Sequence, residues 1–211
     1  MKVYNFSPGP AKLDSSIISK SQQAMYNFQN TGLSILEIGH RSKEFEKLMN
    51  SLQENIRNIF NVPTNYFTLF LQGGATFQNT FIANNFDMRD KDLGCLVTGT
   101  WGKSTFDDFS KIRETKLIEL SQDEIENFVE SGEDLKNVDY LHLTSNETIN
   151  GVQLREFNKI NHDSLLIDMS SDIGSYRFEW DNIAYIYAGA QKNMGIPGVS
   201  ICIGDEKHLN S

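Results

Sequence analysis

Apolar residues recur at helical spacing in two segments of the N-terminal part of the chain. The first segment follows Asp14 and the second covers residues 42–60; in both, apolar side chains return at the period of one helix face. Ser42 is a suitable N-cap, and Val62-Pro63 is expected to end the second helix, because the residue before a proline disfavours helical angles. The positions on the two faces are Ile17, Ile18, Ser21, Ala24, Met25 and Phe28, and then Phe45, Leu48, Met49, Leu52, Ile56, Ile59 and Phe60.

Beyond residue 62 the pattern changes to short apolar runs that are typical of buried strands. Segments with a helical pattern separate several of these runs, and this alternation predicts an α/β fold with a mainly parallel sheet flanked by helices. The predicted strands are residues 67–71, 93–98, 116–120, 138–144, 165–168, 184–187 and 199–203, and the helical segments are 77–86, 104–112 and 123–131. Ligands of such sheets bind at the carboxyl ends of the strands, so the residues after each run are candidates for function.

Composition narrows the class of protein. The 211 residues include 39% hydrophobic and 22% charged residues, which is ordinary for a globular chain of one large or two small domains. A net charge of −9 without a visible basic face argues against a nucleic-acid partner. No apolar run is long enough for a membrane span, and the N-terminus is not a secretory signal. Cys95 and Cys202 give no disulfide framework and favour a reducing compartment, so we expect a cytoplasmic protein.

A glycine pair marks the junction between the first predicted strand and the following helix. In Gln72-Gly73-Gly74-Ala75-Thr76 the glycines let backbone N–H groups approach an anion, and the start of the helix carries positive partial charge. A phosphate group would suit this motif. Glycine pairs are equally common in tight turns that bind nothing, so the motif alone leaves both interpretations open.

The segment GTWGKS at residues 99–104 follows the second predicted strand. Its last three letters match the end of a Walker A loop, but Val97 stands where that loop requires glycine, so we reject an ATPase site. Trp101 lies just past the strand end. A flat indole there either stacks on the ring of a ligand or covers the edge of the core.

Two ionisable residues follow buried runs in the second half of the chain. Asp168 ends an apolar run, and because an unpaired buried carboxylate is costly we expect it to have a functional partner; capping of the next segment is the alternative. Lys192 follows another apolar run. A partly desolvated lysine has a lowered pKa and can attack a carbonyl, whereas an exposed loop lysine has no such role. Residues 143–148 add hydroxyl groups and an amide after a further strand.

These features together meet the requirements of one cofactor. Pyridoxal phosphate needs a lysine for its aldehyde, an acid for its ring nitrogen, backbone donors for its phosphate and an aromatic side chain against its ring. Each candidate group follows a different predicted strand, and the strand ends of a parallel sheet share one edge. We therefore predict a pyridoxal phosphate site.

Several motifs carry a resemblance to a known enzyme family. They are YNFSPGPAKL, GHRS at residues 39–42, FLQGGAT, TGTWGKS, SNETINGVQ, DMSSDIGS and YAGAQKNMGIPG. On these motifs the chain resembles the phosphoserine aminotransferase family, which belongs to the class-V aminotransferases and the fold-type I pyridoxal phosphate enzymes. The resemblance implies a homodimer with a large α/β domain and a small C-terminal domain. It also implies amino transfer from glutamate to 3-phosphohydroxypyruvate, giving O-phosphoserine and 2-oxoglutarate in serine biosynthesis.

The resemblance assigns roles to the residues around the cofactor ring. Lys192 corresponds to the lysine that forms the Schiff base and moves a proton between the substrate α-carbon and C4′ of the cofactor. Asp168 corresponds to the partner of the ring nitrogen, and Trp101 to the residue that stacks on the ring. Thr148 corresponds to a residue beside the ring hydroxyl.

The resemblance also assigns the anion-binding residues. Ala75 and Thr76, helped by Gln191, correspond to the donors for the cofactor phosphate. Arg41, with His40 beside it, corresponds to the substrate-anion site. Arginine suits this task because its planar fork binds a carboxylate or phosphate through two hydrogen bonds.

Members of that family are longer than this chain. We therefore expect that the C-terminal small domain is absent, that residues 1–60 form an N-terminal helical segment contributing to the substrate site, and that residues 61–211 form an incomplete cofactor-binding large domain. Two alternatives stay open, namely a truncated, non-catalytic remnant that binds pyridoxal phosphate and a fold-type I aminotransferase with a different acceptor. No histidine or cysteine spacing indicates a metal site.

Overall fold

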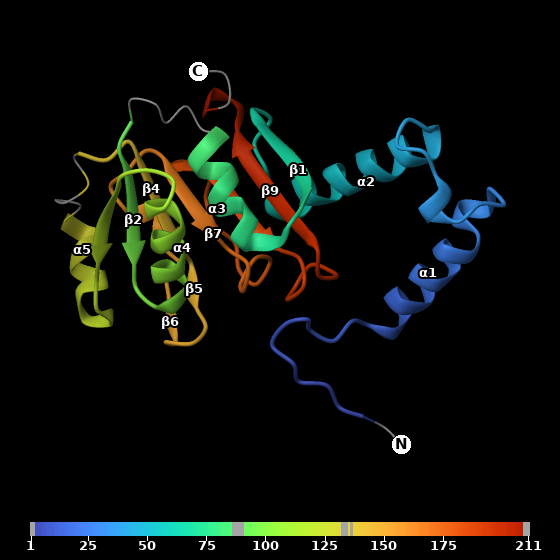
Figure 1. Ribbon diagram of the computed structural model, residues 1–211, viewed down its shortest axis with the longest axis horizontal. Helices are drawn as coiled ribbons and strands as arrows, with labels where there is room; N and C mark the ends of the chain where they lie inside the picture. The colour runs from blue at the N-terminus through green and yellow to red at the C-terminus, as the bar shows by residue number, and fades with distance from the viewer. Residues whose placement is uncertain (1–2, 86–90, 132–134, 136, 209–211) are drawn as a thin grey trace. The chain divides into compact units, whose positions relative to one another are not determined.

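The computed structural model describes residues 3–85, 91–131, 135 and 137–208, which divide into two compact units. The first unit comprises Met1–Asn61 and the second Val62–Ser211 (Figure 1). Each unit has its own internal contacts and is described separately below.

Two α-helices dominate the N-terminal unit. Helix α1 spans Ser15–Tyr26, and helix α2 spans Lys43–Phe60. The side chains of Asp14 and Ser42 accept hydrogen bonds from backbone N–H groups in the first turns, so both predicted helix starts are confirmed. Two short 3₁₀ turns, η1 at Phe28–Asn30 and η2 at Ile35–Glu37, lie between the helices.

Two details of the N-terminal prediction are wrong. Phe28 lies in η1, beyond the end of α1, rather than on the helical face. Helix α2 ends at Phe60, as predicted, but the expected cause, Val62-Pro63, is wrong, because Asn61 already adopts the left-handed conformation, with φ of 50°, and its N–H bonds the carbonyl of Arg57. Asparagine tolerates this conformation better than most residues, so it provides the C-cap itself.

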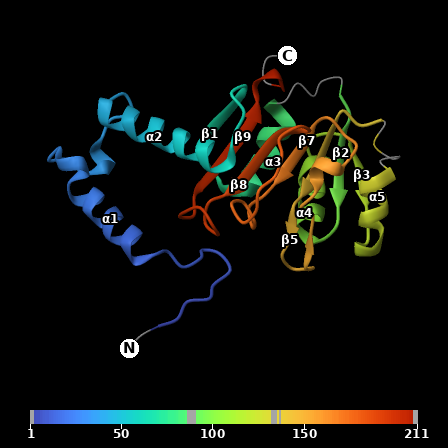
Figure 2. The same ribbon diagram turned by 180° about the vertical axis from the view of Figure 1, so that it is seen from behind.

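The second unit is built on a seven-stranded sheet with the order β1-β9-β8-β7-β4-β2-β3 (Figures 1 and 2). All seven predicted strands are confirmed. Strand β9 pairs antiparallel with β1 on one side and β8 on the other, and the other strand pairs described in the sheet are parallel. The strands are β1 Tyr66–Gln72, β2 Leu93–Val97, β3 Thr115–Glu119, β4 Tyr140–Thr144, β7 Leu165–Asp168, β8 Ile183–Gly189 and β9 Val199–Asp205.

Helices connect the strands as the alternating pattern predicts. Helix α3 spans Gly74–Asn85, α4 spans Thr100–Ser110, and α5 spans Ile125–Ser131 after the 3₁₀ turn η3 at Gln122–Glu124. Helices α3 and α4 lie in front of the sheet in Figure 1 and behind it in Figure 2, so they cover the same face. Between them and the strands lies a buried core that includes Ile82, Val97, Phe109, Tyr185 and Tyr187. Burial of such side chains is the main stabilising contribution.

The carboxyl ends of the strands align at one edge of the sheet. Thr144 at the end of β4 is in register with Asp168 at the end of β7, and Asp168 is in register with Tyr187 of β8. Strands β1 and β8 both run antiparallel to β9, so β1 also ends at this edge. The predicted strand-end motifs therefore lie along a single line, as ligand sites in α/β sheets require.

The structure corrects two expectations at this edge. Residues 145–148 are not simply a polar loop, because β5 (Asn146–Glu147) and β6 (Val152–Gln153) form a small antiparallel hairpin. Helix α4 begins at Thr100, earlier than the predicted residue 104, so Trp101 lies in its first turn. The early start is explained by Glu147, whose carboxylate caps the helix from a distant part of the chain. Within the described ranges, no helix is both long and apolar enough to cross a bilayer.

Candidate functional site

The N-terminus of α3 presents open backbone donors at the carboxyl end of β1. Gly73 and Gly74 have φ of +101° and +68°, a region that side chains avoid, and they turn the chain from strand into helix. The N–H groups of the first helical turn, which includes Ala75 and Thr76, have no acceptor within a helix. Ala75 is partly buried and Thr76 is exposed. This turn can therefore hold an anion, as predicted for these two residues.

The N-terminus of α4 is occupied by the protein itself. The N–H groups of Trp101 and Gly102 donate to the two carboxylate oxygens of Glu147 at 2.8 and 2.6 Å. Asn150 Oδ1 accepts from the N–H and hydroxyl of Thr100 at 2.9 and 3.0 Å. Because Glu147 is fully buried against these donors, a phosphate has no place at this helix end. Of these two helix starts, α3 is thus the one open to an anion.

Trp101, Thr148 and Lys192 come together at the edge of the sheet. The indole Nε1 of Trp101 donates to Oγ1 of Thr148 at 3.0 Å, and Nζ of Lys192 lies 5.7 Å from the centre of the indole ring. Trp101 remains 43% exposed, so part of it is accessible to a ligand. A lysine amine at this distance from an aromatic face is also within the range of a cation–π contact.

Asp168 lies at the end of β7, close to the same lysine. Its Oδ1 accepts the N–H of Ser170 at 2.8 Å. Loss of hydration raises the pKa of the Asp168 carboxyl above its ordinary value, while the bond from Ser170 and the charge of Lys192 act in the opposite direction. The carboxyl is therefore poised for a cationic partner that would stabilise its ionised form.

The loop after β8 holds Lys192 in a fixed turn. The N–H groups of Met194 and Gly195 both donate to the carbonyl of Ala190, and Asn193 Nδ2 donates to the carbonyl of Ile173 at 2.6 Å. Lys192 itself is partly buried. The loop is thus anchored on both sides of the lysine.

Gln191 packs back against the end of β8. Its amide oxygen lies so near Gly189 that a Cβ there would approach it to 2.6 Å. The N–H of Gly189 in turn donates to Ser170 Oγ at 3.0 Å, which ties the lysine loop to the loop carrying Asp168.

Two buried carboxylates at this edge were missed by sequence reasoning. Asp172, only 3% exposed, accepts from Ser145 Oγ, Gln153 Nε2 and the hydroxyl of Tyr176 at 2.6, 3.2 and 3.1 Å. Glu147 is the cap of α4 described above. The signal for both was an acidic residue in a polar strand-end motif, but apart from Tyr176 the partners named here lie far away in the sequence.

His40 and Arg41 belong to the N-terminal unit. Both side chains are exposed, and the two residues lie in the turn before α2, where the N–H of Ser42 donates to the carbonyl of Gly39. Their role in binding the substrate stays a prediction.

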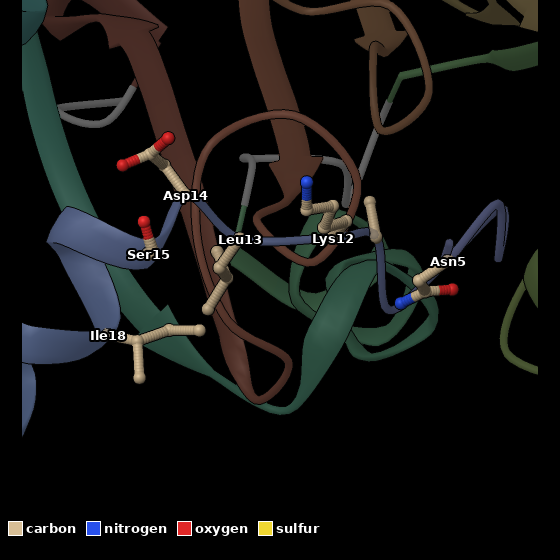
Figure 3. A pocket seen from close by; sticks show the side chains of 7 residues that line it. Asn5, Lys12, Leu13, Asp14, Ser15 and Ile18 are labelled. Carbon is tan, nitrogen blue, oxygen red and sulfur yellow. The ribbon is translucent and has the colours of Figure 1, made fainter. Parts of the chain in front are cut away.

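A pocket of about 390 Å³ also lies in the N-terminal unit (Figure 3). It is lined by Asn5, Ala11, Lys12, Leu13, Asp14, Ser15 and Ile18. None of the predicted site residues is among them. No cluster of three potential metal ligands occurs within the described part of the chain.

Comparison with known proteins places this geometry in a family. The aminotransferase class-V family matches residues 3–211. A phosphoserine aminotransferase of Geobacillus kaustophilus is 40% identical over 206 residues, covering 96% of this chain and 57% of the relative.

Solved structures agree with the sequence comparison. The phosphoserine aminotransferase of Bacillus circulans subsp. alkalophilus superposes with a TM-score of 0.87 at 35% identity, over 100% of this chain and 59% of that one. The pyridoxal phosphate-bound phosphoserine aminotransferase of Trichomonas vaginalis gives 0.84 at 30% identity, over 99% and 63%. The chain thus spans about three fifths of the length of these relatives. The predicted fold class, a mainly parallel sheet like that of a fold-type I large domain, is confirmed, and the chain belongs to the class-V aminotransferase family.

Proposed function

We propose that this chain binds pyridoxal 5′-phosphate and acts as a phosphoserine aminotransferase. The proposed reaction transfers the amino group of glutamate to 3-phosphohydroxypyruvate and yields O-phosphoserine and 2-oxoglutarate. The observation that carries the proposal is the position of Lys192 Nζ, 5.7 Å from the centre of the Trp101 ring at the carboxyl edge of the sheet. The names of the relatives supply the substrates.

The starts of α3 and α4 differ as sites for the phosphate of this cofactor. The N–H groups in the first turn of α3, with Ala75 and Thr76, have no acceptor within the helix, whereas Glu147 binds those of Trp101 and Gly102 in α4. A dianionic phosphate at α4 would also lie against a buried carboxylate, which is strongly unfavourable. Ala75 and Thr76 would therefore bind the phosphate, and we propose that the amide of Gln191 assists them.

The residues around the ring would each have a distinct task. When bound, the cofactor supplies an electron-withdrawing ring that stabilises negative charge at the substrate α-carbon. Asp168 would bind the protonated ring nitrogen, whose positive charge keeps the carboxyl ionised despite its desolvation. Trp101 would orient the ring by stacking, and Thr148 would lie beside the ring hydroxyl.

Lys192 has the two tasks that chemistry demands of a primary amine at this point. Its Nζ would bind the aldehyde carbon of the cofactor, and once released it would move a proton between the substrate α-carbon and C4′. The hydrogen bonds from Met194 and Gly195 to the carbonyl of Ala190 support this proposal, because they fix the backbone of the turn that carries the amine.

The anionic substrate needs a cation, and Arg41 is the proposed one. Its guanidinium fork matches phosphate or carboxylate, and His40 adds a further donor. This role also distinguishes the acceptor. Arg41→Ala should impair use of the phosphorylated acceptor strongly, while equal activity of the unaltered chain with unphosphorylated hydroxypyruvate would favour a different acceptor.

The cofactor proposal is tested by absorbance and chemical trapping. Purified chain mixed with pyridoxal phosphate should develop a visible band, and borohydride should remove the band and leave the cofactor attached to Lys192 in peptide mapping. Lys192→Ala should abolish both results, whereas Lys111→Ala, which removes an exposed lysine paired with Asp108, should change neither. Absence of the band in the unaltered chain would refute the proposal.

Conversion by glutamate separates an enzyme from a non-catalytic remnant. Glutamate should convert bound pyridoxal phosphate to pyridoxamine phosphate if the chain carries out half of the transfer. Binding without conversion would support the remnant.

We further propose a homodimer in the cytoplasm. Support for the dimer comes from large apolar side chains left exposed in the N-terminal unit, including Phe6 at 90%, Tyr26 at 88% and Leu36 at 80%. Support for the reducing compartment comes from Cys95 and Cys202, which are buried and unpaired. Analytical ultracentrifugation tests the dimer directly, since a single species of 24.0 kDa would contradict it.

A further inference from the structure

We propose that Glu147 is a positioning residue that fixes Trp101 against the sheet edge, and thereby sets the plane on which the cofactor ring stacks. That the cofactor ring stacks on this plane rests on the proposed function, whereas the contact between Glu147 and Trp101 is observed in this chain. Glu147 is fully buried and lies in the short hairpin strand β5.

The carboxylate holds the backbone of Trp101 directly. Its Oε2 accepts the N–H of Trp101 at 2.8 Å, and its Oε1 accepts the N–H of Gly102 at 2.6 Å. Hydrogen bonds to an ionised acceptor are shorter and stronger than neutral ones. The negative charge also stabilises the positive N-terminal end of α4, so the helix starts at Thr100 although Gly99 offers no side-chain cap.

The residue after Glu147 holds the indole. Thr148 Oγ1 accepts the Nε1–H of Trp101 at 3.0 Å. Consecutive residues of one hairpin therefore bind the backbone and the side chain of the same tryptophan. The hairpin is itself closed by the N–H of Gly151, which donates to the carbonyl of Glu147 at 2.8 Å.

The glycines on both sides of Trp101 make room for this carboxylate. A Cβ at Gly99 would lie 2.8 Å from Cδ of Glu147, and a Cβ at Gly102 would lie 3.1 Å from Oε1. The GTWG motif thus permits the approach of Glu147 and is not a phosphate cradle. Glu147 and Thr148 therefore bind Trp101, and the two glycines leave the space that the Glu147 carboxylate needs.

The test reads the indole N–H signals of isotope-labelled chain by nuclear magnetic resonance. The chain has two tryptophans, so Trp101→Phe assigns the signal of Trp101 and leaves that of Trp180. Glu147→Ala should shift the Trp101 signal and speed its hydrogen exchange, and should leave the Trp180 signal unchanged. The same variant should raise the Kd for pyridoxal phosphate about tenfold, the size of one net hydrogen-bond contribution.

A matched control removes a different carboxylate from the same helix. Asp107 is exposed on α4 and pairs with Lys103 at 2.9 Å, away from the helix start. Asp107→Asn should leave both the Trp101 signal and the Kd as they are. A folded Glu147→Ala chain with an unchanged Trp101 signal would overturn the proposal.

A second variant keeps the test valid if the alanine variant does not fold. Glu147→Gln has the same shape but presents an NH₂ group to one of the two backbone donors, so it should also shift the Trp101 signal. A wild-type signal and Kd in this variant would overturn the proposal. Failure of the unaltered chain to bind pyridoxal phosphate would instead refute the proposed function, and the indole measurement would stand independently.

Discussion

The hydroxyl of Ser145 donates a 2.6 Å hydrogen bond to Oδ1 of Asp172 inside the protein. Ser145 directly follows β4, and its backbone N–H donates to the carbonyl of Asp168 at 3.0 Å. The pair therefore joins the end of β4 to Asp168, at the end of β7, and to Asp172 in the loop that follows. Asp172 extends this link to β6 through Gln153 and further along the same loop through Tyr176.

Replacing Asp172 with alanine should destabilise the chain by roughly 3 kcal/mol, because the buried hydroxyl of Ser145 and two partly buried hydrogen bonds, from Gln153 and Tyr176, lose their acceptor together. The free energy of unfolding in urea measures the effect. Asp107→Ala, which removes an exposed carboxylate, should cost less than about 1 kcal/mol. Equal losses in the two variants would contradict a special role for Asp172.

Asp168→Asn should stabilise the cofactor-free chain at neutral pH. Burial raises the pKa of Asp168 above the ordinary 3.8, so between pH 3.8 and the raised pKa the folded chain holds a proton that the unfolded chain releases, and above it folding buries a charge. Stability from this group is complete below pH 3.8 and is lost as pH rises through the raised pKa. Asparagine does not ionise, so the variant avoids this loss of stability. It should therefore be more stable than the parent at pH values above the raised pKa, and this difference in stability should vanish below pH 3.8.

The same variant should lower amino transfer about a hundredfold, because the amide cannot provide the charge that holds the ring nitrogen protonated. Urea unfolding across pH, together with glutamate-dependent conversion of the cofactor, measures both effects. A variant that is less stable than the parent at neutral pH would contradict the argument from burial.

His142 should make the chain sensitive to mild acid. It is fully buried, and burial lowers its pKa from 6.5 to about 3. The stability that depends on the neutral ring is present above pH 6.5 and is lost as pH falls toward 3, at about 2 kcal/mol between pH 7 and pH 5.

The contacts of His142 suggest the matched variant. Tyr187 donates its hydroxyl hydrogen to Asn79 Oδ1 at 3.0 Å, so His142 Nε2 is assigned as the donor to the Tyr187 oxygen at 2.9 Å. His142→Gln keeps an N–H donor and cannot titrate. Urea unfolding at the two pH values should therefore show a smaller difference for the variant. The same difference in both chains would exclude His142 as its source.

Local patterns predicted most of the fold. Strands such as β2, β4 and β8 are buried apolar runs, and helix starts such as Ser42 depend on a bond to a residue three positions later. Such interactions are visible in a short window of sequence. The motifs at the strand ends were equally visible, because Asp168 and Lys192 are polar residues that follow apolar runs.

The interactions that were not predicted connect distant segments. Helix α4 starts early because Glu147, 46 residues beyond Trp101, supplies its cap. No local signal at residues 99–104 shows that partner, so those residues suggested a loop. Asp172 is similar, since two of its three donors come from Ser145 and Gln153, 27 and 19 residues away. Sequence patterns located the candidate site, whereas the residues that support it required the three-dimensional structure.

Gly73, which precedes α3, and Gly74, its first residue, offer a matched pair for testing the phosphate site. Both have positive φ, so alanine at either position is strained by about 1 kcal/mol or more. They differ in their surroundings. A Cβ at Gly73 would lie 2.7 Å from the Phe77 ring, whereas a Cβ at Gly74 meets nothing within 4 Å.

Gly73→Ala should therefore lose more stability than Gly74→Ala, by roughly 1–3 kcal/mol, because Phe77 must move out of the way. Phe77 lies in the helix whose first turn is the proposed phosphate site, so Gly73→Ala should also weaken binding of pyridoxal phosphate more than Gly74→Ala does. Urea unfolding and absorbance titration of the two variants measure the two effects. If binding falls equally in both, strain alone explains the loss. If it falls more in Gly73→Ala while pyridoxal, which lacks the phosphate, binds both variants alike, the first turn of α3 is the phosphate site.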